Sequence, residues 1–292
     1  MSNLALRSYV LTALCAILLT ACIGEQPSPS AGRGTFAFEL ATDSLTADIV
    51  TRAPRQLTDA EAAAYRVTLH SATETIWENI PFADITLADR TQPLGTGYVV
   101  SAENISAADA ESLNSGWGAR RYAGSSAPFA ITEGQTTHVT VPCTMANAGL
   151  CVTFDDSFTS YFTEYAVTTA DTRALKFNAD NAFPANTTLP SLTGEGSGVG
   201  PAVAYYNTSL PSLGEGSGVG QLTADVALTI TASAGWDGTV RLTRTLTLQA
   251  GKITRLEVKL NAPQPSTGNI SLMAITYDDH FTEGSTEEIT LE

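Results

Sequence analysis

The sequence has few basic residues, few histidines, few cysteines and only one long apolar run. Fifteen Lys and Arg residues stand against thirty Asp and Glu, a formal net charge of −15, which makes nucleic acid and anionic membrane surfaces poor partners. There are three histidines, and neither a Gly-x-Ser-x-Gly nor a His-Glu-x-x-His pattern occurs. We therefore expect no enzyme activity, no metal site and no cofactor.

The one long apolar run lies at the start, from Tyr9 to Leu19, after the single basic residue Arg7. It is too short for a membrane anchor and has the length of the apolar part of a secretory signal. It ends in Leu19-Thr20-Ala21-Cys22, which resembles the lipobox that bacterial enzymes cleave before the cysteine. This predicts a lipoprotein signal peptide at 1–21, acyl chains such as palmitate on Cys22, and a tether at 22–32. The alternative is an ordinary signal peptide that happens to contain a cysteine.

The body of the chain alternates apolar and polar residues at a period of two, which is typical of half-buried strands. Only Thr58 to Ala64 looks helical, with Thr58 as N-cap and Glu61 completing a capping box. Many short strands with glycine-rich turns predict an all-β fold of two tandem immunoglobulin-like or transthyretin-like β-sandwich domains. The clearest strand segments are 35–40, 65–70, 97–102, 138–141, 226–230, 240–248 and 256–260.

The strand segments fall into two sets, which places the N-terminal β-sandwich at 33–146 and the second at 147–262. Residues 263–292 follow a Pro-Gln-Pro sequence and contain two strand-like arms, which predicts a C-terminal β-hairpin. A two-stranded ribbon is only marginally stable by itself in water. The hairpin must therefore pack on the second domain or add to the sheet of a neighbouring molecule.

Two cysteines remain after the signal segment, Cys143 and Cys151, and they flank a turn-like stretch from Met145 to Gly149. A disulfide across that turn is one interpretation for an exported protein. The other is a pair of free thiols in the core, since cysteine is a common small core residue.

Aromatic side chains near glycine-rich segments are the candidate ligand contacts. Trp117 lies in a glycine-flanked loop and Trp236 in a turn, so either could stack on a sugar, although core packing is the usual place for tryptophan. Tyr205 and Tyr206 lie between the two copies of a Leu-Pro-Ser-Leu sequence that runs into glycines. Neither copy ends in Lys-Ser or Lys-Thr, which favours a long, mobile loop over a phosphate site.

Two similar segments end in paired aspartates, Asp155-Asp156 and Asp278-Asp279. Paired carboxylates can bind calcium, but neither segment has the alternating oxygen ligands of an EF-hand loop. A solvated turn is the favoured interpretation.

Several segments resemble an uncharacterised lipoprotein family of Bacteroidetes that is akin to fimbrillin-type pilus subunits and their anchors. The segments are 97–102, 122–125, 129–135, 139–147 and Thr51-Arg52-Ala53. The resemblance implies a surface lipoprotein built from two β-sandwiches. It also implies that Arg52 or Arg55 could be a protease site. Ser44, in Asp43-Ser44-Leu45, resembles an O-glycosylation site of these bacteria.

Together these features predict a lipid-anchored protein of the outer membrane, exposed at the cell surface, with a non-enzymatic adhesion or fimbria-associated binding or assembly role. Its expected partners are the membrane, through lipid on Cys22, and pilus subunits or host ligands. The alternative is a glycan-binding surface lipoprotein of a nutrient-capture system. A hydrolase with dispersed carboxylates is a third hypothesis.

Overall fold

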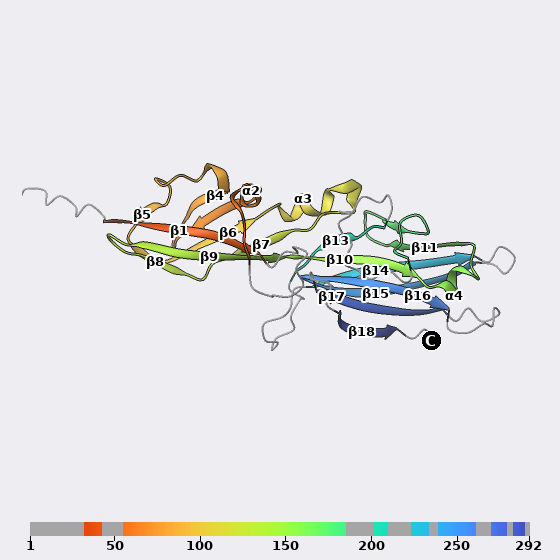
Figure 1. The fold of residues 1–292 in the computed structure, drawn as a ribbon. Coiled ribbons are helices and arrows are strands. Elements are labelled where there is room, and N and C mark those ends of the chain that lie inside the picture. The colour runs from red at the N-terminus through yellow and green to blue at the C-terminus, as the bar shows by residue number, and fades with distance from the viewer. Residues whose placement is uncertain are drawn as a thin grey trace, which may run out of the picture.

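The computed structural model describes residues 32–42, 55–184, 201–209, 223–233, 239–260, 270–278 and 283–289 (Figure 1). Several predicted features lie outside these residues. They are the signal peptide 1–21, Cys22, Ser44, Arg52, Trp236 and the duplicated glycine-rich sequence.

The first nine strands form one curled nine-stranded sheet, here called the N-terminal unit. Its order is β2-β1-β9-β7-β6-β3-β4, with β5 paired to β1 and β8 paired to β6. The strands are β1 (Arg33–Thr42), β2 (Arg55–Gln56), β3 (Arg66–His70), β4 (Thr75–Pro81), β5 (Thr91–Pro93), β6 (Gly95–Glu103), β7 (Tyr122–Ser125), β8 (Phe129–Ile131) and β9 (Thr136–Met145). Short helices join them: α2 (Asp59–Ala62), η1 (Phe82–Asp84), α3 (Ala107–Ser112) and η2 (Asn114–Gly116). The capping box predicted at Thr58 and Glu61 is confirmed at the start of α2.

The other nine strands form two sheets that face each other, here called the C-terminal unit. A five-stranded sheet has the order β13-β10-β16-β17-β18, and a four-stranded sheet has the order β12-β11-β14-β15. The strands are β10 (Asn147–Phe154), β11 (Glu164–Thr169), β12 (Lys176–Phe177), β13 (Ala204–Asn207), β14 (Thr223–Ser233), β15 (Thr239–Gln249), β16 (Lys252–Leu260), β17 (Ile270–Asp278) and β18 (Glu283–Ile289). Helix α4 (Asp156–Thr159) follows β10.

The period-two pattern explains both cores. In β1, Phe36, Phe38 and Leu40 are buried while Ala37 and Glu39 between them are more exposed. In β14, Leu228 and Ile230 face the core of the C-terminal unit. β10 is buried along its whole length, because it is central in its sheet and contacts a hydrophobic cluster on each face. The predicted all-β fold is confirmed.

Strands β9 and β10 follow one line through both units (Figure 1). Only Ala146 separates the end of β9 at Met145 from the start of β10 at Asn147. The turn predicted between Met145 and Gly149 is therefore wrong: the small residues there lie in a nearly continuous strand. The partners change at the same point, since β9 pairs with strands of the N-terminal unit and β10 with strands of the C-terminal unit. That the chain divides at 146 and 262 into separately folding domains stays a prediction.

The two units together form an elongated rod, and the described chain begins at the tip of the rod that is farthest from the C-terminal unit. β1 runs parallel to β9, with Thr35 opposite Thr136 and Thr42 opposite Cys143. Because β9 ends at the junction with the C-terminal unit, the beginning of β1 lies at the opposite end, as Figure 1 shows. Whatever precedes Gly32 therefore leaves from the tip farthest from the C-terminal unit.

The predicted C-terminal hairpin is confirmed as β17 and β18, which pair antiparallel. Of its two predicted placements, the structure has the internal one. β17 pairs with β16 over nine residue pairs, from Lys252 opposite Asp278 to Leu260 opposite Ile270.

The first paired-aspartate segment is a helix start. Asp155 is the N-cap of α4, and its carboxylate accepts hydrogen bonds from the backbone nitrogen and the hydroxyl of Ser157, at 2.9 and 2.6 Å. These bonds lower the pKa of Asp155. Of the second pair, Asp278 ends β17 and Asp279 lies outside the described residues.

Candidate binding groove

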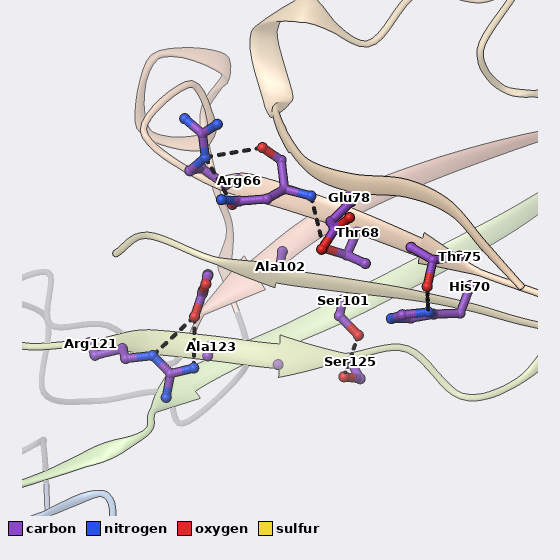
Figure 2. A pocket seen from close by; sticks show the side chains of 13 residues that line it. Arg66, Thr68, His70, Thr75, Glu78, Ser101, Ala102, Arg121, Ala123 and Ser125 are labelled. Atoms are coloured by element: carbon purple, nitrogen blue, oxygen red, sulfur yellow. Dashed lines mark hydrogen bonds and ion pairs between the residues drawn. The ribbon is translucent and has the colours of Figure 1, made fainter. Parts of the chain in front are cut away.

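A polar groove lies on the outer face of the N-terminal unit, over β3, β4, β6 and β7 (Figure 2). The pleat of β3 produces it: Val67 and Leu69 point into the core and are fully buried, while Arg66, Thr68 and His70 point outward. The groove encloses about 580 Å³ and is open to solvent.

The floor of the groove is a row of hydroxyl groups from neighbouring strands. Thr68 lies opposite Ser101, which lies opposite Ser125. The Ser101 and Ser125 hydroxyls are 2.8 Å apart, and Thr68 Oγ1 accepts a hydrogen bond from the backbone nitrogen of Asn79 at 3.2 Å. The floor therefore offers both donors and acceptors.

The walls carry charges of both signs. Arg121 donates to the carboxylate of Glu103 at 2.7 Å at one end, and Arg66 Nε donates to Asn79 Oδ1 at 2.8 Å. His70 Nδ1 and Thr75 Oγ1 are 3.0 Å apart at the other end. Figure 2 shows these pairs around the hydroxyl row. Because Arg66 and Arg121 are balanced by Glu78 and Glu103 in the lining, the groove suits a ligand that hydrogen-bonds better than one with a large net charge.

An irregularity in the β3–β4 pairing shapes one wall. The register shifts between Val67 and Leu69, and Asn79 on β4 has a left-handed backbone with φ of 56°. Such bulges bend a strand and redirect side chains. Here the bulge sets Asn79 within reach of Arg66 and Thr68. Among the described residues, no group of three or more His, Cys, Asp or Glu could hold a metal ion.

Trp117, a candidate sugar contact, lies in the core, which is the usual place for tryptophan. It is only 8% exposed, belongs to the core of the C-terminal unit, and meets Phe177 edge to face with ring centroids 4.9 Å apart. It arrives on a segment between β6 and β7 that leaves the N-terminal unit. Gly116 and Gly118 have φ of 90° and 81°, so the glycines permit the turns around the buried ring rather than marking an exposed loop.

Tyr205 and Tyr206, the other candidate ligand contacts that the structure describes, are buried as well: they are 1% and 5% exposed on β13. The Tyr205 hydroxyl accepts a hydrogen bond from Arg120 Nε at 2.8 Å. The guanidinium of Arg173 lies 4.1 Å from the centre of the Tyr206 ring, and burial raises the pKa of Tyr206. Tyr206 belongs to the core of the C-terminal unit and Tyr205 to a smaller buried cluster that includes Met145, so neither ring offers a face to a ligand.

Arg173 joins the units at this seam, a role that no sequence motif signalled. Its guanidinium donates to the carbonyl oxygens of Gly116 at 3.2 Å and Tyr205 at 2.8 Å, and to the carboxylate of Asp171. Burial would raise the pKa of Asp171, but hydrogen bonds from Thr169 and Arg173, with the charge of Arg173, outweigh burial and lower it.

Cys143 and Cys151 are both free and buried, so of the two interpretations the structure has the pair of free core thiols and not the disulfide. They lie in different hydrophobic clusters. Eight steps along an extended strand separate their Cα atoms by about 26 Å, far beyond the span of about 7 Å that a disulfide bridges. Burial raises the pKa of each thiol to about 12.

Within the described residues, no helix is both long and apolar enough to cross a membrane. A family model described as a domain of unknown function, DUF4493, matches residues 32–195. No curated protein matches the chain.

Two solved structures of proteins from Bacteroidetes share similarity with most of the chain. A fimbrial assembly protein from Parabacteroides distasonis ATCC 8503 is 11% identical with a TM-score of 0.42, and the match covers 88% of this chain and 100% of that one. The fimbrial anchor protein Mfa2 from Porphyromonas gingivalis is 11% identical with a TM-score of 0.34, and the match covers 83% of this chain and 97% of that one.

Proposed function

This chain belongs to the DUF4493 family of domains of unknown function, and on that premise we propose that it is a lipid-anchored protein of the bacterial cell surface with a non-enzymatic adhesion or fimbria-associated binding role. The proposal combines the lipobox-like sequence before Cys22 with the shape of the folded part. Its partners are the membrane, through the acyl chains, and a pilus subunit or host molecule.

The observation that carries the proposal is that the N-terminus and the C-terminal unit lie at opposite ends of the rod. β1 begins at the tip farthest from the C-terminal unit. From Thr136 to Phe154 the extended chain through β9 and β10 spans roughly 60 Å, and the tether 22–32 adds at most about 35 Å. A chain fixed at Cys22 would therefore hold its C-terminal unit well away from the bilayer, which is the arrangement that a surface-binding protein needs.

The groove provides a contact surface of suitable chemistry. Its row of Thr68, Ser101 and Ser125 hydroxyls can exchange hydrogen bonds with a polypeptide backbone or with hydroxyl groups. The Arg121–Glu103 pair at its end is 23% and 29% exposed and can adjust to a polar partner.

The anchor is tested by replacing Cys22 with Ser in the full chain. We expect the unaltered protein to incorporate radioactive palmitate and to sediment with the membrane, and the C22S protein to do neither. Equal labelling of the two would refute the anchor. The fold itself should be unaffected, which circular dichroism of both proteins checks.

The binding role is tested by filling the groove. Ser101→Tyr places a ring over the hydroxyl row, and Thr132→Tyr, at an exposed position outside the groove, is the matched control. Adherence of cells to host surfaces, or capture of pilus subunits, should fall at least about tenfold for S101Y and stay unchanged for T132Y. Unchanged binding by S101Y would remove the groove from the proposal.

A glycan is the second candidate partner, because the hydroxyl row is chemically suited to sugar hydroxyls. The buried Trp117 takes no part in the proposed glycan binding, and Trp236 lies outside the described residues. A glycan array with the full chain and S101Y separates the two candidates: signals lost in S101Y favour a glycan, and no signal for either protein favours a protein partner.

A further inference from the structure

The longest regular edge strand of the molecule has one side unpaired within the described residues. β15 ends the four-stranded sheet and pairs with β14 over eleven residue pairs without a register shift, and no described strand pairs with its other side. Apart from β18, the edges that end the described sheets are protected. β4 carries bulges, β2 and β12 have two residues each, and β13 contacts α3. A long, regular edge without proline is a template for another strand.

The same edge is locally basic in an acidic protein. β15 carries two basic residues and no acidic one, although the chain has a net charge of −15. They are Arg241, which is exposed, and Arg244, which is half-buried. Among the described residues, neither has an ion-pair partner. Two copies of β15 would place arginines near each other, so an acidic strand fits better.

An acidic edge strand is present in the same chain. β18 ends the five-stranded sheet, and no described strand pairs with its outer side. Its sequence contains Glu283, Glu287 and Glu288 and neither Lys nor Arg.

The two edges are offset in a way that lets two molecules interlock. β15 packs over β10 and β16, so the five-stranded sheet extends beyond β15 by β17 and β18. A second molecule, related to the first by a two-fold axis parallel to the strands, would place its own β18 beside β15. Each four-stranded sheet would then continue into the five-stranded sheet of the other molecule.

We propose that the chain forms a two-fold symmetric dimer in which β15 of each copy pairs with β18 of the other. β16 and β18 run in the same direction, because both are antiparallel to β17, and a tight turn at Gly251 sends β16 back along β15. Under this symmetry the new pairs are therefore antiparallel. Both contacts are the same, as a closed two-fold interface requires.

One register matches the charges. With Arg244 opposite Glu287, Glu288 lies opposite Thr243 and diagonal to Arg241. Directly opposite and diagonal side chains on one face are close enough to interact. The regular part of β18, from Ser285 to Ile289, then lies opposite Leu246 to Leu242.

The symmetry also places both N-terminal tips at the same end of the dimer, since the axis runs along the rod. Two copies anchored in one membrane can therefore pair side by side. The pairing itself does not depend on the lipid, so its test is separate from that of the proposed function.

Disulfide trapping in the full chain tests the register. The register places Thr245, which is exposed, opposite Thr286. The T245C/T286C variant, oxidised in the membrane, should run on a non-reducing gel at twice the mass of the single mature chain and return to monomer on reduction. T245C alone should stay monomeric, as should T245C/S285C, whose second cysteine is one residue out of register and so faces the other way. No dimer from T245C/T286C, or equal dimer from T245C/S285C, would overturn the proposal.

Charge reversal tests the pairing without relying on the stability of one variant. In the T245C/T286C background, R241E/R244E should lower dimer yield about tenfold, and E287R/E288R should do the same. Combining all four changes should restore the dimer, because opposite charges again face each other. Failure of the combined variant to recover, while each pair alone reduces the yield, would refute the contact.

Discussion

The free cysteines are examples of residues whose surroundings decide their chemistry. Burial raises the pKa of Cys143 and Cys151 to about 12, and only the thiolate reacts readily. We therefore expect neither to react with a thiol reagent near pH 8 in the folded protein, and both to react at once in denaturant. Rapid labelling of either thiol under native conditions would contradict the structure. The exposed variant Thr245→Cys should label in both conditions and serves as the positive control.

Asp171 makes the seam between the units sensitive to acid. Its pKa is lowered because hydrogen bonds from Thr169 and Arg173 outweigh the effect of burial. A lowered pKa in the folded state stabilises the protein above the ordinary carboxyl pKa of about 4, and that contribution is lost as the pH falls through the lower folded value.

We therefore expect the urea midpoint of the unaltered protein to exceed that of Asp171→Asn at neutral pH, with the gap closing below about pH 4. Measuring both proteins across that range tests this. Asp180→Asn, on an exposed side chain in the same unit, should show no such gap. A gap for Asp171→Asn that is constant with pH would show that the carboxylate's charge is not what matters.

Side-chain contacts could be predicted from the sequence only where both partners lie close together in the chain. The capping residues Thr58 and Glu61 are three positions apart, and their bonds could be predicted. The burial of Trp117 could not, because its cover comes from Phe177 and other residues far along the chain. Arg173 was missed for the same reason: the carbonyls it binds belong to Gly116 and Tyr205.

Among the elements, β7 and β9 approach each other more closely than a side chain allows. A Cβ atom added to Gly124 would lie 1.8 Å from the carbonyl oxygen of Pro142 on β9. Gly124→Ala should therefore lower the free energy of unfolding by about 3 kcal/mol, measured by urea denaturation. Gly95→Ala on β6, where the nearest atom is 3.4 Å away, is the matched control and should change it little. Equal stability of the two variants would contradict the close approach.

Strands were the most predictable elements, because each half-buried strand carries its own period-two pattern. Short helices were less so. Helix α3 was not predicted, although Ser106 accepts a hydrogen bond from the backbone nitrogen of Asp109 and the Ser-x-x-Asp sequence signals such a start. The β9–β10 line was mistaken for a turn, because Ala146, Asn147 and Gly149 are typical turn residues and nothing local shows that strand partners continue on both sides.

At the scale of the whole molecule, the units are joined both by the β9–β10 line and by the segment that carries Trp117 into the second core. Trp117→Ala should cost about 3 to 5 kcal/mol, although the residue follows a strand of the N-terminal unit. Hydrogen exchange should show the loss in β11 and β14 of the C-terminal unit. Leu113→Ala, at a position 44% exposed on the same segment, should leave that protection intact. Loss of protection confined to the N-terminal unit would refute the role given to Trp117.

Composition and patterning predicted an all-β molecule in two parts, but not how the sheets are ordered. β1 pairs with β9 about a hundred positions later, and β10 with β16 at a similar distance. Side-chain periodicity records which face is buried and carries no information on which strand lies alongside.

The parallel pairing of β1 with β9 determines how the molecule would respond to pulling. A load applied between a fixed N-terminus and the C-terminal unit would draw β1 toward one tip and β9, through β10, toward the other. The eight residue pairs that join them would then bear the tension together, in shear, instead of opening one after another like a zipper. The greatest resistance to such a load would lie at β1, the strand nearest the proposed point of attachment.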